Sequence, residues 1–177
     1  MKDQIIVLYN SHTGFTQRYA ELIGKELDCP ACALKDAPSD LSQYGAVVFG
    51  SRLHAGIFDG WKKAKKLLAK RGARKLVVFA TGAMPNEAEG QIQKVWEQNL
   101  TPEERNSIPH FYLQAGLCLE KLGRGDRAML KVAAWAMGRK KAKSAEDAAF
   151  ADAISRSYDI FDPKYIQPLT DCLRELE

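Results

Sequence analysis

The residues that follow the first apolar run have the types that hold a phosphate group. Residues 10–16 read NSHTGFT, so three hydroxyl side chains and a glycine lie where a strand would pass into a helix. The first turn of a helix has free N–H groups and a partial positive charge, which favour a dianion without a lysine. Ser11, Thr13 and Thr16 can each donate one more hydrogen bond, and Gly14 allows a close backbone approach. We therefore predict a phosphate-binding loop here.

Two other phosphate-binding patterns do not fit this segment. A Walker loop ends in Gly-Lys-Ser or Gly-Lys-Thr, and a dinucleotide fingerprint needs three spaced glycines. Residues 10–16 contain neither pattern. A structural interpretation stays open, because serine and threonine near the start of a helix commonly act only as caps. The position after the first buried strand favours the phosphate interpretation.

Strands and helices must alternate along the chain to position this loop. Apolar runs at residues 5–9, 46–51 and 76–80 predict buried strands, 31–35 predicts a weaker edge strand, and 110–114 predicts a fifth strand. Apolar residues at three- and four-residue spacings predict helices at 15–27, 57–70 and 87–99 and a terminal helix after Asp162 as N-cap. Such alternation forms a parallel sheet with helices on both faces, and ligands bind beyond the carboxyl ends of its strands.

Composition agrees with an ordinary globular protein. The chain has 177 residues, of which 46% are hydrophobic and 27% charged, which argues against intrinsic disorder, collagen and coiled coil. One domain over residues 1–177 is expected. No apolar run reaches the roughly 18 residues that a membrane-spanning helix needs, and we see no cleavable leader. We therefore expect a cytoplasmic protein. The net charge of +4 favours anionic partners without requiring nucleic acid.

The first loop and the strand before it resemble a known family. Residues 6–16, IVLYNSHTGFT, are similar to the FMN phosphate loop of flavodoxins. The resemblance implies an α/β three-layer sandwich with a five-stranded parallel sheet in the order 2-1-3-4-5, and FMN as a non-covalent cofactor. It also implies that loops after the third and fourth strands flank the isoalloxazine ring. The cofactor contacts implied in this way are Ser11, His12, Thr13, Gly14, Phe15, Thr16, Ser51, Arg52, Leu53, His54, Ala55, Gly56, Thr81, Gly82, Ala83 and Met84.

The chain departs from electron-carrier flavodoxins, which carry acidic surfaces and usually aromatic residues beside the flavin. Its second loop has Arg52 and His54, and its third loop has Met84. A positive group close to the ring would stabilise an anionic reduced flavin. Surface positions for Arg52 and His54 stay open as the alternative.

Further segments carry a closer resemblance, namely residues 50–56 (GSRLHAG), 111–117 and 127–141, Tyr158-Asp159, and Asp162 before the last helix. They are similar to the corresponding segments of the menaquinone-dependent protoporphyrinogen oxidases of the flavodoxin type, so the resemblance covers nearly the whole chain. This resemblance implies an FMN-dependent oxidoreductase of haem biosynthesis that passes electrons from a porphyrinogen to a quinone. It assigns no catalytic acid or base. Two alternatives stay open: a flavodoxin-like electron shuttle that docks on a redox partner protein, and an interaction module that has kept the fold and lost the cofactor.

A basic segment follows the fifth strand. From Arg127 to Lys141 the sequence predicts an amphipathic helix that contains Trp135 and ends in basic residues. Such an inserted helix can lie on an anionic membrane surface or bind a carboxylated planar substrate. In the alternative interpretation its apolar face packs on the sheet and its lysines are solvated.

The remaining cysteines and histidines do not predict a metal site. Cys29 and Cys32 form a CxxC pair, but the pair follows a predicted helix instead of beginning one, so a reactive dithiol is not favoured. The chain has no second CxxC pair that could complete a zinc site. His12, His54 and His110 are too scattered along the sequence to indicate a cluster.

Overall fold

The computed structural model of the chain describes residues 4–139 and 154–176. The chain divides into two compact units, one formed by Met1–Ala115 with Phe161–Glu177 and the other by Gly116–Ile160. One domain over residues 1–177 stays a prediction.

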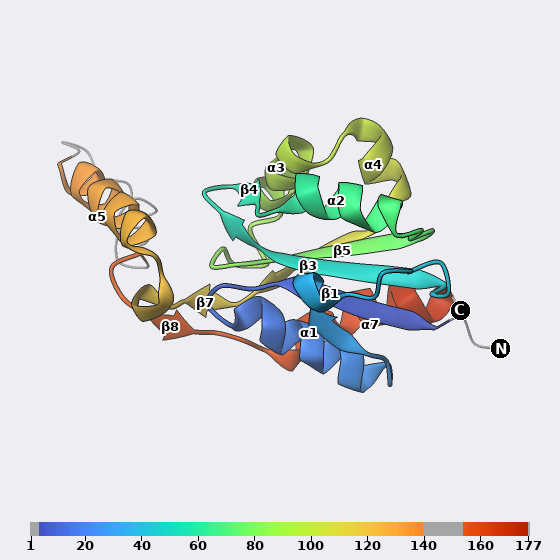
Figure 1. Ribbon diagram of the computed structural model, residues 1–177. Coiled ribbons are helices and arrows are strands. Elements are labelled where there is room, and N and C mark those ends of the chain that lie inside the picture. The colour runs from blue at the N-terminus through green and yellow to red at the C-terminus, as the bar shows by residue number, and fades with distance from the viewer. Residues whose placement is uncertain (1–3, 140–153, 177) are drawn as a thin grey trace. The chain divides into compact units, whose positions relative to one another are not determined.

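A parallel sheet runs through the first unit (Figure 1). Its strands lie in the order β2-β1-β3-β5-β6, which confirms the predicted five-stranded order 2-1-3-4-5. A short sixth strand, β4, pairs antiparallel with the end of β3. The bounds are Ile5–Asn10 for β1, Ala31–Ala33 for β2, Ala46–His54 for β3, Ile57–Phe58 for β4, Leu76–Gly82 for β5 and His110–Gln114 for β6.

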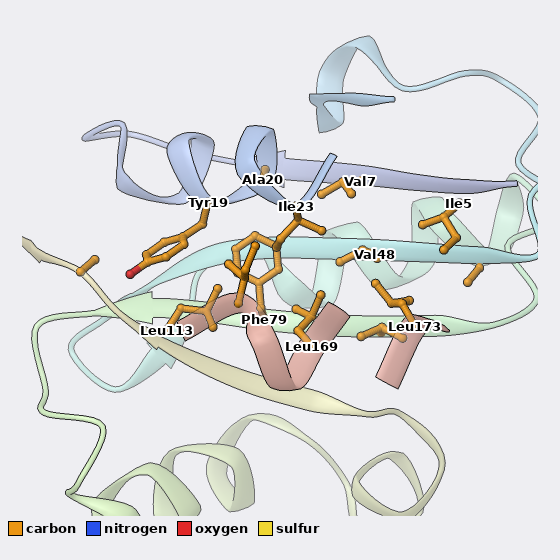
Figure 2. Packing of buried hydrophobic residues seen from close by; sticks show 14 residues of the cluster. Ile5, Val7, Tyr19, Ala20, Ile23, Val48, Phe79, Leu113, Leu169 and Leu173 are labelled. Atoms are coloured by element: carbon orange, nitrogen blue, oxygen red, sulfur yellow. The ribbon is translucent and has the colours of Figure 1, made fainter. Parts of the chain in front are cut away.

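Two hydrophobic clusters cover the two faces of this sheet. Because side chains alternate along a strand, Ile5 and Val7 belong to one cluster and Ile6 and Leu8 to the other. Helices α1 (Phe15–Glu26) and α7 (Gln167–Glu175) fill the first cluster, which Figure 2 shows with Tyr19 and the leucines of α7 against the strands. Helices α2 (Trp61–Lys70) and α3 (Glu89–Asn99) fill the second. The fold is therefore the predicted α/β sandwich.

The segment after β3 differs from its prediction. The strand runs three residues past the expected end at 51, and the predicted helix 57–70 divides into β4, a turn at Gly60 with φ of 71°, and α2. Residues 57 and 58 do not join the helix because Ile57 and Phe58 pair with β3, and this pairing uses backbone groups that a helix would need. The predicted second loop is therefore a β-hairpin.

Helix α4 (Pro102–Ser107) was not predicted. It begins with a capping box, in which the Thr101 side chain accepts from the Glu104 N–H and Glu104 accepts from the Thr101 N–H. In the C-terminal segment of the same unit, Asp162 acts as the predicted cap, and its side chain accepts from the Lys164 N–H at 3.0 Å. The cap precedes a 3-10 helix, η3 (Pro163–Ile166), and α7 continues from it.

The second unit contains a two-stranded sheet and a helix. Strands β7 (Gly116–Leu117) and β8 (Tyr158–Asp159), which were not predicted, pair antiparallel. A 3-10 helix, η2 (Leu119–Lys121), leads to α5 (Arg124–Gly138). The predicted helix 127–141 therefore begins three residues earlier and ends at Gly138; Lys140 and Lys141 lie outside the described residues. Within the described ranges, no helix is long and apolar enough to cross a membrane.

Candidate functional site

The first loop joins β1 to α1 through a left-handed residue. Gly14 is the N-cap of α1 with φ of 97°, a conformation that costs other residues roughly 1–2 kcal/mol. No side chain caps the helix, and the Ser11 Oγ atom accepts from the Gly14 N–H at 3.2 Å instead. The first N–H groups of α1 therefore keep their hydrogen-bonding capacity and lie at the positive end of the helix dipole. This arrangement favours an anion.

The sheet register brings the ends of three strands together. Asn10 of β1 lies beside Ser51 of β3, and Arg52 of β3 lies beside Thr81 of β5. The Ser51 hydroxyl donates to the Asn10 carbonyl oxygen at 3.4 Å. The segments predicted around residues 11–16, 51–56 and 81–84 thus begin at one edge of the sheet.

A buried hydroxyl pair joins the first segment to the third. The Oγ1 atoms of Thr16 and Thr81 are 2.8 Å apart, and both residues are buried. The Thr16 hydroxyl is therefore hydrogen-bonded to β5 and is not an open group in the loop. In contrast, Thr13 is half-buried, and its hydroxyl makes no hydrogen bond within the described part of the chain. The two threonines of the loop thus have different environments.

Asp59 joins the first loop to the hairpin that replaces the predicted second loop. Its Oδ2 atom lies 3.2 Å from Arg52 Nε and 3.4 Å from His12 Nε2, and its N–H donates to the Arg52 carbonyl oxygen at 3.0 Å. The carboxylate offsets the positive charge of Arg52, which lowers the net charge that this side chain brings to the site. Sequence reasoning missed Asp59, because its role depends on the strand pairing of the hairpin.

The tip of the hairpin is held by α3. Ala55 and Gly56 have φ of 49° and 78°, and they connect His54 at the end of β3 to β4. The Asn99 side chain donates to the Gly56 carbonyl oxygen at 2.8 Å and accepts from the Phe58 N–H at 2.7 Å. The predicted residues 54–56 are therefore fixed by an asparagine for which the sequence offered no signal.

The third segment begins inside β5 and is anchored on β6. Thr81 and Gly82 belong to the strand, so only Ala83 and Met84 of the predicted contacts lie beyond it. The Tyr112 hydroxyl donates to the Met84 carbonyl oxygen at 3.0 Å. A Cβ atom on Gly82 would lie 2.8 Å from that hydroxyl oxygen, so the residue must be small.

Two hydrogen bonds between the side chains and backbones of Asn86 and Gln114 add to this anchor on β6. The Asn86 N–H donates to Gln114 Oε1 and the Gln114 N–H donates to Asn86 Oδ1, both at 3.2 Å. The Gln114 carbonyl oxygen accepts from the hydroxyl of Tyr19, whose pKa burial raises to about 12. Tyr19 is therefore a neutral donor at ordinary pH. Sequence reasoning also missed Asn86, Gln114 and Tyr112.

The CxxC pair lies away from these strand ends, around the start of β2. Burial and the charge of Asp36 raise the pKa of the Cys32 thiol, which disfavours the thiolate that redox chemistry or metal binding needs. Cys29, Cys32, Cys118 and Cys172 all lie within the described residues, and none of them forms a disulfide there. Across residues 4–139 and 154–176, no three His, Cys, Asp or Glu side chains are grouped to hold a metal ion.

Residues 6–144 match the family model described as a flavodoxin domain. No curated protein matches the chain. Among solved structures, the chain is similar to a flavodoxin, WrbA-like protein from Agrobacterium tumefaciens (18% identity, 71% of this chain and 88% of that chain, TM-score 0.40). It is also similar to a flavodoxin from the domain Archaea (16% identity, 86% of this chain and 99% of that chain, TM-score 0.39). A third similar structure is oxidised Flavodoxin 2 from Bacillus cereus (18% identity, 86% of this chain and 97% of that chain, TM-score 0.36).

Proposed function

The chain belongs to the flavodoxin domain family, and from this premise we propose that it is an electron-transfer protein that holds FMN at the carboxyl ends of β1, β3 and β5. FMN is the cofactor that the family implies, and when bound it supplies the redox chemistry. The observation that carries the site proposal is the start of α1, where a left-handed Gly14 replaces a side-chain cap.

The residues of the first loop fit a phosphate group. The uncapped amides of α1 supply donors and a favourable dipole. Ser11 accepts from the Gly14 N–H and can still donate its own proton, and the Thr13 hydroxyl makes no hydrogen bond among the residues that the structure describes. Thr16 acts mainly by tying the loop to Thr81. In this proposal the phosphate is held by residues 11–16 without any lysine.

The hairpin and the third segment fit the role of flanking the isoalloxazine ring. Both are short, and side chains from neighbouring elements fix their backbones, namely Asn99 for the hairpin and Tyr112 for the third segment. Fixed backbone N–H and C=O groups can orient a flavin and tune its electronics. The proposed ring contacts are Ser51, Arg52, Leu53, His54, Ala55, Gly56, Thr81, Gly82, Ala83 and Met84.

Two finer roles follow from different parts of the chain. The oxidoreductase role, with a porphyrinogen as electron donor and a quinone as acceptor, is supported by the basic helix α5 after the fifth strand. The shuttle role is supported by Ile57, an exposed apolar side chain on the hairpin beside the proposed site, where a redox partner protein could dock. The first role needs small-molecule turnover, whereas the second needs only a protein partner.

Anaerobic reactions of the FMN-loaded protein distinguish these roles. For the oxidoreductase, protoporphyrinogen must reduce the bound flavin, and a short-chain quinone must reoxidise it over repeated turnovers. For the shuttle, porphyrinogen leaves the flavin oxidised, while a reductase partner reduces it, and Ile57→Ser slows that protein-mediated step. A protein that does not retain FMN on gel filtration would contradict both roles.

A further inference from the structure

One face of helix α5 packs against other residues of the second unit (the partnered face), and another face is exposed to solvent (the open face). The partnered face contributes Leu130 and Ala134 to a groove of about 470 Å³, which Leu119 of η2 and Ile154 also line. The Arg127 side chain anchors this side by donating to the carbonyl oxygens of Glu120 and Leu122. The apolar residues of the partnered face therefore already have neighbours.

The open face combines large apolar side chains with cations. Met129, Val132 and Trp135 are 43%, 63% and 61% exposed, and their three-residue spacing makes one stripe along the helix. Lys131 lies beside the stripe and is exposed, and the Arg139 guanidinium lies 4.5 Å from the centre of the Trp135 ring. We call these five residues the α5 face.

The five residues of the α5 face include two cations and no carboxylate, and Lys131 also lines the edge of the groove that contains Glu120. The one acidic residue of α5, Asp126, is half-buried in the turn before the stripe. A surface helix with tryptophan and aliphatic residues between Lys and Arg side chains lies in the plane of a bilayer interface, with its cations at anionic headgroups. An ordinary solvated helix would not expose three large apolar side chains in one row.

We propose that the α5 face binds the surface of an anionic lipid bilayer, with Val132 and Trp135 among the headgroups and acyl chains and with Lys131 and Arg139 at the lipid phosphates. Charge complementarity selects this occupant, since the cations surrounding the stripe match anionic headgroups. The inference does not depend on FMN. It would place the protein at the membrane surface, where apolar electron acceptors dissolve.

Tryptophan fluorescence of the full chain tests the proposal directly. Trp61 and Trp96 are buried, so of the three tryptophans only Trp135 is exposed to the solvent. Vesicles of phosphatidylcholine mixed with phosphatidylglycerol should shift the emission to shorter wavelength and protect it from iodide quenching. Vesicles of phosphatidylcholine alone should do neither. Trp135→Phe should remove the fluorescence change while the protein still sediments with anionic vesicles.

Matched variants separate the α5 face from general adhesion. Lys131→Gln should lower vesicle partitioning about fivefold, as expected for about 1 kcal/mol per cation near an anionic surface, and Lys66→Gln on α2 should not. Val132→Ser should weaken binding, whereas Ile57→Ser, at an exposed apolar site in the first unit, should leave it unchanged. Circular dichroism of each variant verifies that it is folded. Failure of the wild type to bind anionic vesicles at low salt, or equal binding by Val132→Ser, would overturn the proposal, and capture of an acidic protein without any lipid binding would do the same.

Discussion

Thr13→Ala is the substitution that isolates the proposed phosphate contact. The Thr13 hydroxyl makes no hydrogen bond within the described residues, so its loss breaks no internal hydrogen bond, and the free energy of unfolding should change by less than about 0.5 kcal/mol. A hydrogen bond to a charged group contributes about 1.5–3 kcal/mol. FMN affinity should therefore fall by roughly ten- to a hundredfold. Riboflavin, which lacks the phosphate, should bind the variant and the wild type equally.

Thr16→Val is the contrasting variant in the same loop. Removing this hydroxyl leaves the buried Thr81 Oγ1 atom without its partner at 2.8 Å, which should cost about 1–3 kcal/mol of stability. The double variant Thr16→Val with Thr81→Val should recover most of the lost stability, because no buried hydroxyl is then left without a hydrogen-bond partner. We therefore expect the Thr13 substitution to lower FMN affinity and the Thr16 substitution to lower stability.

Fluorescence titration of the apo-protein with FMN and with riboflavin measures the affinities, and urea denaturation measures the stabilities. An equal loss of FMN and riboflavin affinity in Thr13→Ala would refute the reasoning, because the side chain would then act on the ring or on the fold. Unchanged FMN affinity would refute it as well, since Thr13 would have no phosphate contact.

Four further substitutions test other parts of the structure. Asp59→Asn should raise the two-electron midpoint potential of bound FMN in a dye-coupled titration, because it removes a negative charge from the proposed site and so favours the more negatively charged reduced flavin; a lower potential would contradict this. The pKa of Tyr19 is raised from 10.0 to about 12 in the folded chain, so its stabilisation is complete below pH 10 and is lost as the pH rises toward 12. Urea denaturation of Tyr19→Phe should show a smaller loss over that range than the wild type, and parallel losses would argue against the assignment. Gly50→Ala should destabilise the fold by about 1–3 kcal/mol because its Cβ atom would lie 2.0 Å from the Phe79 ring, whereas Gly125→Ala meets no atom within 4 Å and should be neutral or stabilising in thermal denaturation.

The sequence predicted the sheet because its strands are long apolar runs that leave little ambiguity. Within the runs at 5–9 and 76–80, residues 5–8 and 77–80 are buried on both faces, as their composition required. It did not predict the hairpin after β3, because Ile57 and Phe58 also fit the apolar spacing of the helix that follows. Helix α4 could have been found, since Thr101 and Glu104 have the spacing of a capping box.

The candidate site was predictable only in part. Local spacing indicated the first loop, because a glycine and hydroxyl residues between a strand and a helix are a local pattern. The contacts that fix the other segments join residues far apart in the chain, such as Thr16 with Thr81 and Asn86 with Gln114. These pairs follow from strand register and loop packing, which a single sequence does not encode at any fixed spacing.

The most direct test of the central claim is a titration of the apo-protein with FMN, followed by anaerobic photoreduction and read by absorbance. The account predicts saturation at one FMN per chain, tighter binding of FMN than of riboflavin, and a bound flavin that is reduced and reoxidised reversibly. A chain that stays colourless after excess FMN is removed, or that binds riboflavin as tightly as FMN, would contradict the phosphate loop at residues 11–16.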